Sequence, residues 1–149
     1  MPKVLVATSA GGHWVQMRRL LPAFAGCELV FAGTADRLDA DLGPASYTRL
    51  RNVSRSDPLG FLVVAWQLAR LVRRERPDAV VTTGAAPGLV ALAAAKLLAG
   101  SRTVWIDSIA NSERLSLSGR LARPVADLRL VQWPHLARPG GPEHWGAVL

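Results

Sequence analysis

The sequence contains very little cysteine, with Cys27 alone among 149 residues. A single cysteine excludes an internal disulfide framework and a cysteine-rich metal site, and it fits a reducing compartment. Long apolar runs are also missing, because no window reaches the roughly 20 apolar residues that a membrane-spanning helix needs. The apolar run after Lys3 ends at Thr8-Ser9, which is too short for a secretory signal peptide. We therefore expect a protein that is not membrane-integral but that can still lie on a membrane surface.

Lysine is scarce as well, and arginine supplies most of the positive charge. The chain has 16 arginines, two lysines and 11 acidic residues, which gives a formal net charge of +7. This balance points to nucleic acid, an anionic membrane or a phosphate-bearing substrate. An arginine- and alanine-rich composition can equally reflect a GC-rich genome. Because the arginines are not interleaved with aromatic residues, and helix-turn-helix and zinc-finger spacings are absent, we expect no nucleic-acid partner.

The sequence also lacks the glycine-rich motifs that are typical of nucleotide-binding proteins. Neither G-x-G-x-x-G nor G-x-x-x-x-G-K-[ST] occurs in the sequence. Asp36 lies where a ribose-binding acid would stand, but it is more simply an acidic residue at the positive end of a helix dipole. The sequence also has no cluster with metal-ligand spacing. We therefore expect neither a cofactor nor a metal ion.

The pattern that is present is an alternation of short β-branched runs with longer helical segments. Half of the residues are apolar, enough to bury a core, and the length is that of one domain. Continuously apolar strands alternating with helices favour a parallel sheet covered on both faces. We predict a Rossmann-like α/β fold with a doubly wound parallel sheet over residues 1–137, and a loop-like C-terminal tail over 138–149. The expected strands are Lys3–Thr8, Glu28–Ala32, Tyr47–Leu50, Ala79–Thr83, Thr103–Asp107 and Leu128–Val131, and the expected helices are Trp14–Phe24, Ala35–Leu42, Leu59–Arg76, Gly88–Ala99 and Leu117–Val125.

Two glycine turns follow expected strands, and ligands bind at such strand ends in open α/β sheets. Gly11 and Gly12 precede the first helix, where bare backbone N–H groups suit a phosphate. His13 comes next, either as a phosphate donor or sugar-hydroxyl base, or as a capping or packing histidine. The second turn spans Thr82 to Gly88, with Pro87 expected at the first helical position.

The helix expected at Leu59–Arg76 combines an apolar first half with a basic second half. Arginines at a helix C-terminus complement the helix dipole. An apolar segment with a tryptophan and a basic collar equally suits an interfacial helix on anionic lipid, to which Arg18, Arg19 and Arg55 would add charge. The candidate membrane contacts are Leu59, Phe61, Leu62, Trp66, Arg70, Arg73 and Arg74.

The most specific pattern follows the fifth expected strand. It consists of Leu115-Ser-Leu-Ser-Gly-Arg-Leu121, Pro124, Ala126-Asp127 and Val131-Gln-Trp-Pro134. This pattern resembles the signature of the acceptor-binding, membrane-recruiting subunit of two-part glycosyltransferases, a family that serves asparagine-linked glycosylation in eukaryotes and capsule and exopolysaccharide assembly in bacteria. The Ser9-Ala-Gly-Gly-His13 turn, the Thr83-Gly84 turn and Asp107 fit the same family in order, so the resemblance covers nearly the whole chain, from Val4 to Leu136.

The resemblance implies the N-terminal half of a GT-B glycosyltransferase, like that of the peptidoglycan enzyme that makes lipid II. Such a subunit binds a lipid-diphosphate-linked sugar acceptor and the membrane, while a separate partner binds the UDP-sugar. The heterodimer then transfers N-acetylglucosamine or a related hexose to a polyprenyl- or dolichyl-diphosphate-linked acceptor. The eukaryotic subunit has an N-terminal membrane helix, whereas this chain starts at its first strand. We therefore expect peripheral contact on the cytoplasmic face of the membrane. The alternatives are a non-catalytic module that docks the partner on the membrane, and an unrelated nucleotide-binding domain.

The resemblance also assigns roles to individual residues. His13 and Asp107 are rival candidates for the catalytic base. Arg114 is a candidate diphosphate contact. Ser116 is expected to cap the helix that begins at Leu117, and Trp133-Pro134 is expected to pack the domain edge. The candidate substrate-binding residues are Ser9, Gly11, Gly12, Gly84, Pro87, Gly88, Asn111 and Arg114.

Overall fold

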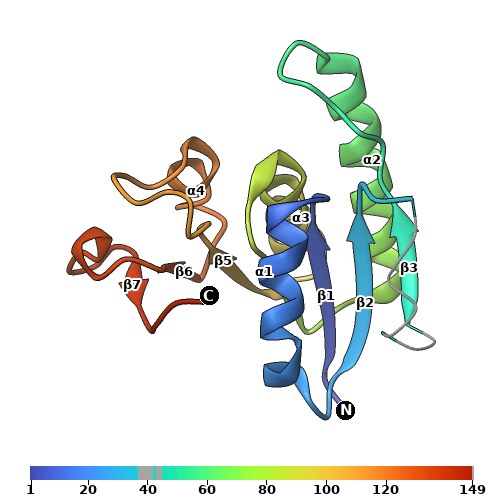
Figure 1. Cartoon of the computed structure of the whole chain (residues 1–149). Helices are drawn as coiled ribbons and strands as arrows, with labels where there is room; N and C mark the ends of the chain where they lie inside the picture. Colours follow the sequence, from blue (N-terminus) through green and yellow to red (C-terminus); the bar gives the residue numbers. More distant parts are fainter. Residues whose placement is uncertain (37–41, 43–44, 149) are drawn as a thin grey trace.

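The computed structural model describes residues 1–36, 42 and 45–148 (Figure 1). Most of the helix expected at Ala35–Leu42 lies outside the described residues. Within them, one sheet has the strand order β3-β2-β1-β4-β5-β6-β7, and every neighbouring pair is parallel, which confirms the predicted doubly wound parallel sheet. Its strands are β1 (Lys3–Thr8), β2 (Glu28–Gly33), β3 (Ser46–Arg49), β4 (Ala79–Thr82), β5 (Arg102–Ile106), β6 (Leu128–Val131) and β7 (Glu143–His144).

Helices cover both faces of the sheet, as the apolar strands require. Side chains alternate along β1, so Leu5 joins the core beneath α2 and α3, whereas Val6 joins the core that contains Met17 of α1. Leu68 of α2 and Leu92 of α3 are fully buried in the first of these cores. The helices are α1 (Gly12–Leu20), α2 (Pro58–Glu75), α3 (Ala85–Leu98) and α4 (Leu117–Leu121), with 3-10 turns η1 (Leu21–Phe24) and η3 (Pro134–Leu136).

Proline explains two of the differences from the expected helix bounds. The helix expected to reach Phe24 ends at Leu20, because Pro22 has no N–H to continue the ladder, and the chain tightens into η1. The helix expected at Gly88 begins at Ala85 instead. Pro87 is therefore the third residue of α3, still in the first turn, where a missing N–H costs little.

The C-terminal segment is more ordered than the loop that the sequence predicted. It contains β7, which extends the sheet beside β6. The backbone N–H of Val148 donates to Gln132 Oε1 at 2.8 Å, and His144 Nδ1 lies 3.1 Å from the Val131 carbonyl oxygen. The sequence did not predict β7, because a strand of two residues leaves no periodic signal.

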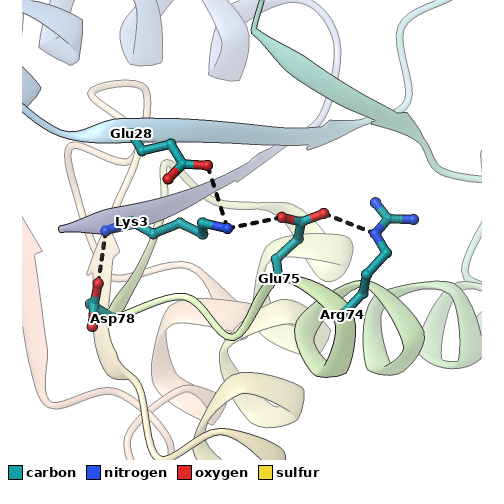
Figure 2. Close-up of polar contacts among 5 residues, drawn as sticks. All are labelled: Lys3, Glu28, Arg74, Glu75 and Asp78. Carbon is teal, nitrogen blue, oxygen red and sulfur yellow. Dashed lines mark hydrogen bonds and ion pairs between the residues drawn. The ribbon is translucent and has the colours of Figure 1, made fainter. Parts of the chain in front are cut away.

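A charged cluster lies at the opposite edge of the sheet from the carboxyl ends of β1 and β4 (Figure 2). Lys3 Nζ lies 3.2 Å from a Glu75 oxygen and 3.4 Å from a Glu28 oxygen, and Arg74 Nε lies 2.8 Å from Glu75. The hydrogen bond to Glu75 raises the pKa of Lys3. The hydrogen bonds from Arg74 and from Lys3 lower the pKa of Glu75. The cluster ties β1, β2 and the end of α2 together and takes no part in the site described next.

Candidate active-site cleft

A cleft of about 510 Å³ opens at the carboxyl edge of the sheet. It is bounded by the start of α1, the β4–α3 turn, the loop after β5 and the start of α4, which are the segments that the fold places at one edge. Its lining combines polar side chains with leucines of α3 and α4. The polar and charged lining side chains are His13, Arg55, Asp107, Ser108, Asn111, Ser116 and Ser118.

His13 is held by a reciprocal pair of hydrogen bonds with Thr83, which lies 70 residues later in the sequence. His13 Nδ1 lies 3.0 Å from the Thr83 carbonyl oxygen, and Thr83 Oγ1 donates to the His13 carbonyl at 2.7 Å. A carbonyl oxygen only accepts, so Nδ1 carries the hydrogen. In the neutral ring, Nε2 is then the nitrogen with a lone pair. The geometry thus leaves a potential proton acceptor at the cleft.

Gly84 permits the close approach of the two glycine turns. A Cβ at this position would lie 2.8 Å from Cε1 of His13 and 3.0 Å from Nδ1, which is too close for a side chain. The backbone of Gly84 also has φ of +129°, a region that other residues rarely adopt. Gly84 lines the cleft, and its absent side chain is what lets the imidazole stand against the β4–α3 turn.

Asp107 is 2% exposed and accepts four hydrogen bonds from the protein itself. Oδ1 accepts from Trp105 Nε1 at 2.9 Å and from Ser116 Oγ at 2.6 Å. Oδ2 accepts from Asn111 Nδ2 and from the Ser116 backbone N–H, both at 3.1 Å. A carboxylate offers about four acceptor positions, so all of them are occupied. This geometry favours a structural role for Asp107, which holds the loop after β5 to the start of α4, over the role of a base.

The Ser-x-x-Gly part of the sequence signature belongs to the same hydrogen-bonded group, which we call the Asp107 cluster. Ser116 caps α4, as expected, by accepting a hydrogen bond from the Gly119 N–H at 3.0 Å. A Cβ on Gly119 would lie 2.7 Å from Asp107 Oδ1 and 2.8 Å from Trp105 Nε1. The motif therefore requires glycine so that the first turn of α4 can rest on the buried carboxylate and indole.

The Val131-Gln-Trp-Pro134 block supports the other end of the same loop. Gln132 Nε2 donates to the Asp107 carbonyl at 3.0 Å and to Gln16 Oε1 at 2.7 Å. Gln16 in turn donates to Ser108 Oγ at 3.0 Å. Trp133 Nε1 donates to the Ile109 carbonyl at 2.7 Å, so this tryptophan braces the loop behind the cleft and does not line it.

The structure brings some of the expected site residues together and separates others. His13, Gly84, Asp107 and Asn111 line the cleft. Ser9 lines a different hollow, of about 20 Å³, beside Trp14 and Tyr47. The remaining expected residues do not line the cleft and lie as follows: Gly11, Gly12 and Arg114 are exposed, whereas Pro87 and Gly88 are buried.

Pro87 and Gly88, two of the expected substrate-binding residues, are buried near the start of α3, and the lining of the cleft does not include them. A Cβ on Gly88 would lie 2.1 Å from Thr82 Oγ1, so this glycine serves helix–strand packing. Ala85, Ala86 and Leu89 line the cleft in their place.

The outward face of α2 is apolar in its first half, where a soluble surface would be polar. Leu59, Leu62 and Trp66 are 71%, 66% and 61% exposed, and the Arg70 guanidinium stacks over the Trp66 ring at 5.4 Å. Phe61 is half-buried because it lies about 200° around the helix from Leu59. We call this exposed face of α2 the α2 stripe. It continues with exposed Arg70, Arg73 and Arg74. It also includes Val63, which was not among the expected membrane contacts.

The first half of α2, which carries the apolar side chains of the stripe, projects beyond the carboxyl ends of β1 and β2 (Figure 1). The apolar part of the stripe therefore lies toward the same end of the molecule as the cleft, whereas Arg74 lies at the opposite edge of the sheet, beside Glu75 and Lys3. None of the helices in the described part of the chain is long and apolar enough to span a membrane. The described residues also include no group of three or more metal-ligating side chains.

Several solved structures share this fold. MurG from Acinetobacter baumannii superposes with a TM-score of 0.77 at 18% identity, over 96% of this chain and 45% of that one. The UDP-GlcNAc 2-epimerase from Neisseria meningitidis gives 0.66 at 15% identity, over 87% of this chain and 40% of that one. The chain thus spans less than half the length of these structures. Fold and cleft define its class: a Rossmann-like α/β unit like one half of a GT-B enzyme.

Sequence comparison then identifies the family. Residues 45–148 match the family described as "Oligosaccharide biosynthesis protein Alg14 like", and the chain belongs to this family. The UDP-N-acetylglucosamine transferase subunit ALG14 of Yarrowia lipolytica is 31% identical over 163 residues, covering 91% of this chain and 76% of that protein. The human subunit of the same name is also 31% identical, over 166 residues, 89% of this chain and 76% of that protein. The resemblance read from the signature is confirmed.

Proposed function

We propose that this chain is the acceptor-binding subunit of a two-component glycosyltransferase. With a UDP-sugar-binding partner, it would transfer N-acetylglucosamine or a related hexose to a polyprenyl- or dolichyl-diphosphate-linked acceptor. The observation that carries the proposal is the cleft, which combines an oriented imidazole with hydroxyl and amide groups suited to a sugar. The names of its relatives as transferase subunits support the same function.

The proposed chemistry needs one proton acceptor on this subunit. An acceptor hydroxyl oxygen attacks C1 of the donor sugar, and a new C–O bond forms. The bond between C1 and the phosphate oxygen breaks, and UDP leaves with that electron pair toward the partner. The hydroxyl proton passes to Nε2 of His13, whose ring is oriented by Thr83. Asn111 and Ser118 are placed to hydrogen-bond the acceptor sugar, and the exposed Gly11 and Gly12 turn stays a candidate contact.

A test of this function uses the chain together with a UDP-sugar-binding partner subunit. Because the chain supplies only half of a GT-B-like cleft, we expect no transfer by the chain alone. Transfer of radiolabelled N-acetylglucosamine from UDP-N-acetylglucosamine to a short-chain polyprenyl-diphosphate-sugar is expected once the partner is added. The partner alone is the matched control. Transfer by the isolated chain at the rate of the mixture would overturn the two-component proposal.

The α2 stripe is the surface that we assign to the membrane, in a peripheral contact on the cytoplasmic face. Exposed leucine and tryptophan side chains enter the lipid interface, and basic side chains beside them favour anionic headgroups. The position of the stripe would bring the cleft close to the level of the lipid headgroups (Figure 1). A lipid-linked acceptor could then enter the cleft without leaving the bilayer.

Removing the apolar half of this stripe is expected to weaken vesicle binding. The double variant Leu62→Ser, Trp66→Ser should reduce binding to vesicles containing anionic lipid by about tenfold or more, because two large apolar side chains no longer enter the interface. Co-sedimentation measures the effect. The matched control is Leu97→Ser, which alters an 80% exposed leucine of α3 outside the stripe. Equal loss in both variants would contradict the assignment of α2.

A further inference from the structure

Arg55 is the only arginine or lysine among the described residues that line the cleft. It forms no ion pair within the described part of the chain, whereas Arg51 pairs with Asp57 and Arg74 pairs with Glu75. The lining has one other formally charged group, the carboxylate of Asp107. Its oxygens already accept four hydrogen bonds from the protein itself. Arg55 thus gives the cleft a guanidinium that pairs with no acidic side chain of the described residues, and such a group suits an anionic group on the ligand.

The loop that carries Arg55 is fixed at both ends. The Asp57 N–H donates to the Ser54 carbonyl at 3.1 Å, which closes a turn around Arg55, and Asp57 Oδ1 caps α2 through the Gly60 N–H at 2.8 Å. On the other side, the Arg51 N–H donates to Gln67 Oε1 of α2 at 3.0 Å. The backbone under Arg55 is thus ordered before any ligand arrives, which lowers the entropic cost of binding.

Apolar surfaces adjoin this charge. Leu117 and Leu121 of α4 line the cleft and remain 52% and 55% exposed. Arg55 itself comes three residues before Pro58, the first residue of α2, so the membrane stripe begins next to the arginine. The lining of the cleft thus combines three kinds of group: polar side chains, one cation and apolar side chains. A sugar joined through a diphosphate to an isoprenoid has chemical groups that match these three kinds.

We infer that Arg55 binds the diphosphate of the lipid-linked acceptor, an inference that rests on the proposed function. The guanidinium offers two parallel N–H donors to phosphate oxygens, a geometry that lysine cannot reproduce. The acceptor sugar then points toward His13, and the first isoprenoid units pass over Leu117 and Leu121. This assignment replaces Arg114, which the sequence favoured for the same contact but which does not line the cleft.

The test measures acceptor affinity in the assembled heterodimer, with a short-chain polyprenyl-diphosphate-N-acetylglucosamine as the probe. Arg55→Ala should raise KM for this probe by about tenfold to a hundredfold, because a charge-assisted contact is lost. KM for the UDP-sugar should stay within about twofold, since the partner binds it. Arg55→Lys should recover only part of the loss. The matched control Arg123→Ala, which changes an exposed arginine that does not line the cleft, should leave both KM values within about twofold.

A direct binding measurement separates the two proposals. Isothermal titration of the chain with the same probe, and with its monophosphate analogue, should show that Arg55→Ala weakens the diphosphate compound more than the monophosphate. Equal affinity of wild type and Arg55→Ala would overturn the role of Arg55 and leave the proposed function standing. A wild-type chain that neither binds the probe nor supports transfer with its partner would overturn the proposed function, and the inference with it.

Discussion

His13→Ala is expected to reduce sugar transfer by the assembled heterodimer by about a hundredfold to ten-thousandfold, while the heterodimer itself stays intact. The expectation rests on the orientation of the ring. His13 Nδ1 is committed to the Thr83 carbonyl, so Nε2 is the nitrogen that can accept a proton. A capping role is disfavoured, because no side chain caps α1 within the described residues. A purely packing role would not require Gly84 to leave room beside the ring.

The control for this prediction is Val15→Ala, which shortens an exposed side chain two positions later on the same helix. It should keep transfer within about twofold of wild type. His13→Gln is a second informative variant, since its amide can still donate a hydrogen bond to a phosphate but cannot act as a base. It should therefore be nearly as inactive as His13→Ala. Full transfer by His13→Ala in an intact heterodimer would favour the alternative, a docking module that leaves all chemistry to the partner.

A positioning role for Thr83 can be checked in the same assays, because its hydroxyl and carbonyl both contact His13. The hydroxyl also lies 3.3 Å from Thr8 Oγ1, so the two threonines and the histidine form one hydrogen-bonded group. In the sequence, Thr8 and Thr83 each end an expected strand. The sequence could not show that they face the first glycine turn, because that contact depends on β1 and β4 becoming neighbours.

Much of the fold was predictable because periodicity and glycine turns are local. The bounds of all six expected strands, β1 to β6, agree with the structure to within one residue, and α2 is shifted by a single residue. The two-residue β7 was missed because it is too short to carry a pattern. The start of α3 was misplaced because proline is tolerated throughout the first turn and not only at its first position.

The site was less predictable than the fold, since it depends on contacts between distant segments. Arg55 lies in a loop whose composition gives no sign that it reaches the cleft, whereas Arg114 lay next to the recognised motif and attracted the assignment. Asp107 stood at the correct strand end, but its four donors come from residues 105, 111 and 116, and only the folded chain reveals that they converge. A sequence pattern places a carboxylate at an edge without showing whether its oxygens are free.

Asp107→Ala is expected to cause the largest loss of stability among the variants considered, about 3 kcal/mol or more in the free energy of unfolding. Four donors would lose their acceptor at a site that water does not reach. The loop after β5 and the start of α4 would separate, and both form walls of the cleft. Transfer activity should fall with stability. Urea unfolding of the isolated chain measures the first effect, and the heterodimer assay measures the second.

Two further variants distinguish a positioning role for Asp107 from that of a base. Gly119→Ala keeps the carboxylate but places a Cβ 2.7 Å from its Oδ1. If the Asp107 cluster is structural, this variant should lower both stability and transfer. Asp127→Asn is the matched control, because Asp127 pairs with Lys96 and Thr103 outside the cleft, and the Lys96 contact lowers the pKa of Asp127. Asp127→Asn should lower the free energy of unfolding by about 1 kcal/mol and leave transfer nearly unchanged.

With His13 as the base, the Asp107→Asn heterodimer should retain the wild-type shape of its pH–rate profile at reduced amplitude. Loss of the acidic limb of that profile in Asp107→Asn, together with wild-type stability, would instead return the role of base to Asp107.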